Sequence, residues 1–104
     1  MIENFLFCLR NGIPVRGAVI GRDTVQNGPY SFTIDTCFVS DCSCYETAIK
    51  KLNDNWVVVE HYSSPEEASE GHAEWVKYAS TNSMPTFVDI LSHEIYIYNT
   101  QEEE

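Results

Sequence analysis

Three of the four cysteines lie close together and are the first candidates for chemistry. Cys37, Cys42 and Cys44 could supply thiolates to a zinc ion, which takes four ligands in a tetrahedral array. Three histidines could supply the fourth ligand: His61, His72 and His93. The spacing C-x4-C-x-C lacks the two-residue gap typical of zinc motifs. We therefore expect small buried or half-buried thiols, with a metal site at the three cysteines as the alternative and no cofactor.

The turn between two predicted strands decides which thiols meet. If Ser40-Asp41 is a two-residue turn, Cys37 lies directly across from Cys44, with β-carbons roughly 5 Å apart. A disulfide between them would require an oxidising compartment. The N-terminus has no basic region or small-residue cleavage pattern, so we expect no signal peptide. The cysteines are then predicted to be reduced thiols in the cytoplasm of a bacterial host, with a virion as a second location.

His72 is the other candidate for acid–base chemistry, on the apolar face of a predicted helix. It has no recognisable nucleophile, paired carboxylates or phosphate-binding glycine pattern to work with. We expect a histidine at the edge of the core that donates to a strand carbonyl. No catalytic residue is predicted, and the chain is not expected to be an enzyme.

Two groups of residues could bind a partner. Glu66, Glu70 and Glu74 share one side of the predicted helix and present spaced carboxylates to arginines of another protein, or form a solvated face. Tyr96 and Tyr98 lie on a terminal strand, which is a natural pairing edge. The alternative is that both rings cover the domain's own helix.

The charge limits the class of partner. Sixteen acidic residues against six basic ones give a net charge of −10, which repels nucleic acid and anionic membranes. The acidity provides solubility or competes with nucleic acid for a basic partner. The 104 residues fit one domain, in which residues 99–104 form a frayed acidic tail. No stretch approaches the roughly 20 apolar residues that a membrane span needs.

The elements that hold these residues predict an α+β fold, an antiparallel meander packed by one main amphipathic helix. Alternation and turn residues predict the strands of the meander: residues 30–39, 44–49 and 56–62. A hairpin is expected within residues 5–20 and a last β-run at 94–99, while residues 87–91 are ambiguous. Residues 21–29 are expected to be a loop, because Asn27-Gly28-Pro29 is a strong breaker.

The helix has the clearest signals. Ser64-Pro65-Glu66-Glu67 is a capping box, in which the Ser64 hydroxyl accepts from the Glu67 N–H and the Glu67 carboxylate returns to the Ser64 N–H. Apolar residues then recur at helical spacing as far as Ala79. Gly71 is expected to let the helix sit close to the sheet, under Trp56 or a neighbour, and residues 82–85 end the helix.

Part of the chain resembles a pattern in small phage and prophage proteins. The matching residues begin with Glu46-Thr47-Ala48-Ile49 and Trp56-Val57-Val58-Val59-Glu60-His61-Tyr62. They continue with Glu66-Glu67-Ala68, Gly71-His72, Trp75-Val76 and Met84-Pro85-Thr86 to Asp89. The resemblance covers about residues 44–90 and implies a phage origin, without a settled activity. It also implies that Gly71, His72 and Trp75 belong to the joint between helix and sheet.

These observations lead to one expected function and two alternatives. We expect a non-enzymatic, acidic phage accessory protein that binds a protein partner, such as a host factor or a defence component. The first alternative is a virion or assembly component that self-associates through its C-terminal strand. The second is a small metal-binding protein that uses Cys37, Cys42 and Cys44.

Overall fold

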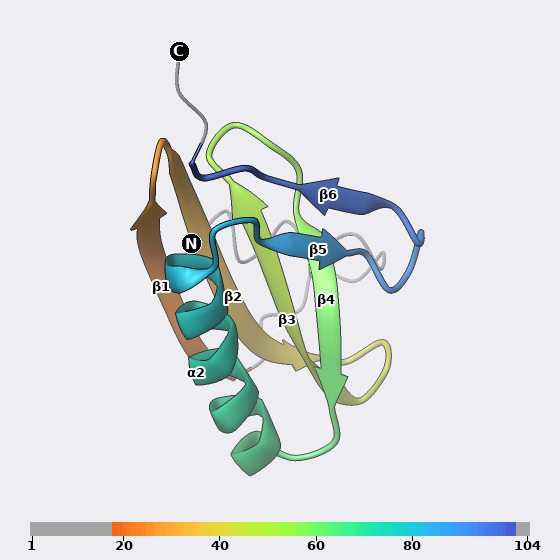
Figure 1. Ribbon diagram of the computed structural model, residues 1–104. Coiled ribbons are helices and arrows are strands. Elements are labelled where there is room, and N and C mark those ends of the chain that lie inside the picture. Colours follow the sequence, from red (N-terminus) through yellow and green to blue (C-terminus); the bar gives the residue numbers. More distant parts are fainter. Residues whose placement is uncertain (1–17, 102–104) are drawn as a thin grey trace.

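The computed structural model describes residues 18–101 and is built on a four-stranded antiparallel sheet (Figure 1). The strands lie side by side in chain order: β1 (Val19–Asn27), β2 (Tyr30–Val39), β3 (Cys44–Lys51) and β4 (Val57–Tyr62). Helix α2 (Pro65–Thr81) covers one face of this sheet, and strands β5 (Thr86–Val88) and β6 (Ile95–Ile97) form a separate antiparallel pair. The predicted α+β class, a meander packed by one main helix, is confirmed.

Strand β1 corrects the prediction of a loop at residues 21–29. Asn27 pairs with Tyr30 across a two-residue turn, and the ladder extends back to Val19 opposite Cys37. Gly28 occupies this turn with φ of +60°, a conformation that glycine adopts without strain. The breaker residues therefore mark the tip of a hairpin, and pairing with β2 supplies the backbone hydrogen bonds that make the preceding residues a strand. The hairpin expected within residues 5–20 falls largely outside the described residues.

The connection between β2 and β3 differs from the predicted two-residue turn. Residues 40–43 all belong to the turn, and Ser43 adopts a positive φ of 51°. As a result Val39 lies opposite Cys44, and Cys37 lies opposite Glu46. The prediction that Cys37 faces Cys44 is wrong, because the longer turn shifts the pairing by two residues.

Helix α2 begins as its sequence predicts, with one difference. The Ser64 hydroxyl accepts from the Glu67 N–H at 3.1 Å, but the Glu67 carboxylate accepts from the N–H and hydroxyl of Ser63, not from Ser64. The buried side of the helix carries Ala68, Gly71, His72 and Ala79. Within residues 18–101, no helix combines the length and the apolar character needed to cross a bilayer.

Apolar side chains gather on both faces of the sheet. The cluster on the helix side contains Phe32, Ile34, Ile49, Val57, Val59, Ala79 and Phe87. The second cluster contains Cys37, Val39, Ala48 and Val58, with Trp56 packed against it. Gly71 does let the helix approach the sheet, but its neighbour there is Tyr62. Trp75 is half-buried against the helix-side cluster, with its ring centroid 6.2 Å from that of Phe87.

Thr100 is held more firmly than the predicted frayed tail at residues 99–104 implies, and residues 102–104 of that prediction lie outside the described residues. Thr100 is buried, and its N–H and hydroxyl both donate to the Ser83 carbonyl, at 3.0 and 2.9 Å. Its own carbonyl packs against Gly28, where an added β-carbon would lie 2.3 Å away. The tail prediction is wrong for Thr100, because these hydrogen bonds anchor it next to the β1–β2 hairpin.

Candidate functional site

A groove lined by carboxylates runs between β4 and helix α2. Four glutamates line it, here called the acidic groove: Glu60, Glu67, Glu70 and Glu74. Tyr62 and Gly71 lie between them, and a β-carbon on Gly71 would stand only 2.3 Å from the Tyr62 hydroxyl. The missing side chain therefore sets how closely the helix approaches β4. One end of the groove continues into a hollow beside Trp75, Tyr78 and Thr86, and the other reaches the cysteine turn.

Of the three helix glutamates predicted to bind a partner, two line the acidic groove and one does not. Glu70 and Glu74 line the groove, whereas Glu66 is exposed on the helix outside this lining. Sequence periodicity missed Glu60 and Glu67. Glu60 comes from a strand, so no helical pattern could include it, and Glu67 was assigned to the helix cap.

A chain of hydrogen-bonded side chains crosses the interface between sheet and helix and ends in this groove. Its contacts are Asp23 Oδ2 to His72 Nε2 (2.7 Å), His72 Nδ1 to Thr36 Oγ1 (2.7 Å), Thr36 Oγ1 to Thr47 Oγ1 (2.6 Å), Thr47 Oγ1 to Tyr62 Oη (3.0 Å) and Tyr62 Oη to Glu60 Oε1 (3.2 Å). The Trp75 indole N–H also donates to Glu60, at 2.8 Å. Burial raises the pKa of Tyr62 above its usual value, so the phenol keeps the proton that it donates. The chain thereby fixes the Glu60 carboxylate in the groove.

This chain corrects the expected environment of His72. The ring contacts a threonine hydroxyl and a carboxylate, not a strand carbonyl. Asp23, His72 and Thr36 follow the acid–histidine–hydroxyl order of nucleophilic sites. Thr36, however, is fully buried and also bonded to Thr47, so no substrate can reach its hydroxyl. The arrangement joins helix to sheet.

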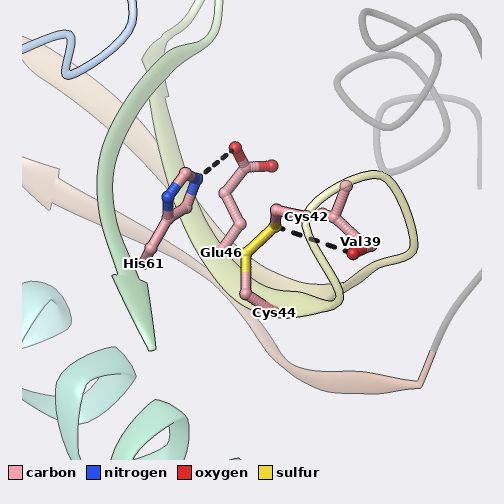
Figure 2. The surroundings of a disulfide bond; sticks show 5 residues. All are labelled: Val39, Cys42, Cys44, Glu46 and His61. Carbon is pink, nitrogen blue, oxygen red and sulfur yellow. Dashed lines mark hydrogen bonds and ion pairs between the residues drawn. A yellow bond between two sulfur atoms is a disulfide. The ribbon is translucent and has the colours of Figure 1, made fainter. Parts of the chain in front are cut away.

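The cysteine turn holds the second cluster of reactive side chains (Figure 2). Cys42 and Cys44 form a disulfide with a Cα–Cα distance of 5.1 Å, which overturns the prediction of reduced thiols at these two positions. Only Ser43 separates the two residues, and the turn at Ser43 directs their side chains toward each other. Cys37 is buried on β2 and takes no part in this disulfide. The sequence therefore identified the right segment, but it placed Cys37 next to Cys44, whereas Cys42 is the residue bonded to Cys44.

His61 extends this cluster from the neighbouring strand β4. One of its ring nitrogens and the sulfurs of Cys42 and Cys44 all lie within 4.8 Å of one another. His61 Nε2 is 3.1 Å from Oε2 of Glu46, whose side chain is buried. Figure 2 shows the ring, the carboxylate and the disulfide gathered where β3 and β4 meet the turn. Of the three histidines considered as ligands, the structure brings His61 to the cysteines.

A third feature is an apolar surface on the β5–β6 hairpin, here called the hairpin face. Val88 and Ile95 pair across the strands and point outward with Ile97, and the turn adds Ile90 and Leu91. Ile95 and Ile97 are each 61% exposed. The alternate side chains of the same strands, which include Phe87, pack against the core.

The predicted partner-binding tyrosines lie on the inward side of this hairpin. Tyr96 and Tyr98 both pack against the helix-side cluster, and the Tyr98 ring centroid is 5.3 Å from those of Tyr30 and Phe32. Burial raises the pKa of Tyr98, whose hydroxyl donates to Asp54 at 3.0 Å. The strand alternates isoleucine with tyrosine, so it is apolar on both sides, and the pattern alone did not show which side faces out.

Comparison with known proteins adds no functional label. No family model matches this sequence, and neither the curated proteins nor the solved structures gave a match.

Proposed function

We propose that this protein binds another protein through the hairpin face and the adjoining acidic groove. The observation that carries the proposal is the exposure of the hairpin face, with both isoleucines of β6 61% exposed. Large apolar side chains gathered on one side of a hairpin are typical of interaction sites, whereas single exposed apolar residues are common everywhere. A non-enzymatic binding role is the function that this surface supports best.

The groove indicates the chemistry of the partner. Thr86, on the outward side of β5, also lines the hollow that continues the acidic groove past Trp75. A segment lying across both surfaces would meet isoleucine side chains first and glutamates next. Between residues 78 and 101 there is no lysine or arginine to repel it. The complementary partner therefore presents apolar side chains followed by lysine or arginine.

Charge also favours such a partner over a second copy of this chain. Two copies would each bring a net charge of −10 to the contact, and like charges across an interface cost binding energy. Strand β6 still offers a pairing edge, so self-association through the C-terminal strand is the competing outcome of the test. Light scattering at tens of micromolar separates the two, because the proposal predicts a monomer.

Affinity capture with matched variants tests the surface. Because the resemblance indicates a bacterial host, tagged protein is incubated with bacterial lysate at low and high salt. The double variant Ile95→Thr/Ile97→Thr should lose a polypeptide that wild type retains, while Leu52→Thr should keep it. Leu52 is an equally exposed residue, at 61%, in the β3–β4 turn. Each buried isoleucine contributes about 1.5–3 kcal/mol, so the double change should weaken binding at least about tenfold.

The contribution of the groove is tested by removing single charges from the same helix. Glu70→Gln removes a carboxylate that lines the groove, and Glu66→Gln makes the same change outside that lining. Glu70→Gln should weaken retention at low salt and Glu66→Gln should not. Capture that is equally strong for the wild type and the isoleucine double variant would refute the proposal.

A further inference from the structure

We propose that Cys42, Cys44 and His61, with Glu46, form a zinc site that exists only when the disulfide is reduced. The starting observation is that a ring nitrogen of His61 lies within 4.8 Å of both sulfurs. The three side chains come from two elements, the β2–β3 turn and strand β4, so the fold and not the sequence spacing assembles them. Cys42 and His61 are exposed, so an ion can reach the site from solvent.

The donor set matches the preferences of zinc. Two thiolates and an imidazole are its common protein ligands, and a structural site takes a fourth. Glu46 lies two residues beyond Cys44 on β3, and its Oε2 is 3.1 Å from His61 Nε2. Two ligand atoms, each about 2.0–2.1 Å from a tetrahedral zinc, are separated by roughly 3.3 Å. Glu46 lies outside the group of three ligand atoms, so it becomes the fourth ligand by exchanging its hydrogen bond to His61 for the ion.

The sulfurs decide whether the site is available. Zinc binds thiolates, and in the disulfide each sulfur is bonded to the other. Two molecules of a small thiol reduce the disulfide to two cysteine thiols and leave as one small-molecule disulfide. Zinc then displaces the two thiol protons. In the reverse direction a small-molecule disulfide takes the two electrons, the Cys42–Cys44 bond reforms and the ion is released.

The position of the disulfide favours this exchange. Cys42 is exposed in a turn, so an attacking thiolate can reach its sulfur. Only one residue separates the two cysteines, and a loop this short restricts the unfolded chain very little. Opening the disulfide therefore costs the fold little, and the sheet and helix remain to hold His61 and Glu46 in place.

Cobalt and zinc titrations test the proposal on the 104-residue protein. Protein reduced with a phosphine and freed of metal by dialysis should bind one equivalent of Co²⁺, with thiolate charge-transfer bands and the visible bands of tetrahedral cobalt, and Zn²⁺ should displace it. The oxidised protein should bind neither ion. Circular dichroism on each sample checks that reduction leaves the fold intact.

Matched variants identify the ligands. His61→Ala should weaken Zn²⁺ binding by at least about 100-fold, whereas His93→Ala, which removes an exposed histidine of the β5–β6 turn, should not. Cys42→Ser should abolish the charge-transfer bands, and Cys37→Ala should preserve them. Uptake well below one equivalent by the folded reduced protein would overturn the proposal. Equal affinity of oxidised and reduced protein, or of His61→Ala and wild type, would also overturn it.

Discussion

Asp35 should make the stability of this protein fall as the pH rises through the weakly acidic range. Its side chain is fully buried on β2 and accepts a hydrogen bond from Arg22 at 2.5 Å. Burial raises its pKa from 3.8 to about 6, against the opposing effect of the Arg22 guanidinium. The folded state therefore holds the proton more tightly than the unfolded chain does.

The sign and size of the effect follow from this difference. Below the unfolded pKa of 3.8, Asp35 is protonated in both states and costs nothing. Between pH 3.8 and about 6 the unfolded chain releases this proton while the folded state keeps it, so stability is lost until the folded carboxyl also ionises at about pH 6. A rise of about two pKa units, at about 1.4 kcal/mol each, gives roughly 3 kcal/mol between pH 4 and pH 7.

Asp35→Asn removes the titration and keeps the shape of the neutral carboxyl. Urea unfolding of wild type and variant, measured at several pH values between 4 and 7.5, gives the stability difference at each pH. This difference should shift in favour of the variant by up to roughly 3 kcal/mol across the range. Asp41→Asn, on the exposed β2–β3 turn, reports the effect of removing one charge alone. A difference between Asp35→Asn and wild type that is the same at pH 4 and pH 7 would refute the reasoning.

Three further changes test the packing of the helix and hairpin. Gly71→Ala places a β-carbon 2.3 Å from Tyr62, so overpacking of about 1–3 kcal/mol should exceed the helix gain of about 1 kcal/mol, and urea unfolding should show a less stable protein. His72→Leu should cost about 1–3 kcal/mol in the same assay, because it breaks the chain between Asp23 and Thr36; unchanged stability would contradict that role. His93→Gly should raise the melting temperature, because His93 has φ of 70°: relieving a left-handed backbone is worth about 1–2 kcal/mol, which exceeds the unfolded-state entropy that glycine adds, about 0.4–1 kcal/mol.

Local signals predicted the elements that local physics fixes. The Ser64 cap, the proline after it and the apolar spacing up to Ala79 determine helix α2 within its own sequence. The alternation of residues 30–39 likewise determines β2. The Asn27-Gly28-Pro29 breaker predicts a loop at residues 21–29. Pairing with β2 overrides that preference, and the sequence does not show which partner a weak strand will find.

The candidate site was harder to predict, because its residues are far apart in the chain. The acidic groove combines Glu60 of β4 with helix glutamates, and only the close approach at Gly71 sets them side by side. The residue opposite Cys37 depends on the length of the β2–β3 turn. The turn is two residues longer than predicted, so Glu46 and not Cys44 lies opposite Cys37. The hairpin face could not be predicted because isoleucine and tyrosine alternate along β6, and either set of side chains could have faced the core. Phe87, which pairs with Tyr96 from the neighbouring strand, packs in the core and so places the tyrosines inward.

The most direct test of the proposed binding surface is an NMR titration of the isotope-labelled protein with a short peptide in which a run of leucines is followed by a run of lysines. Binding should shift the amide signals of residues 86–97 and of residues lining the acidic groove, with shifts that shrink in Ile95→Thr/Ile97→Thr and at high salt. A matched peptide of leucine and glutamate should have little effect. Shifts spread evenly over the sheet, or equal shifts with the two peptides, would contradict the account.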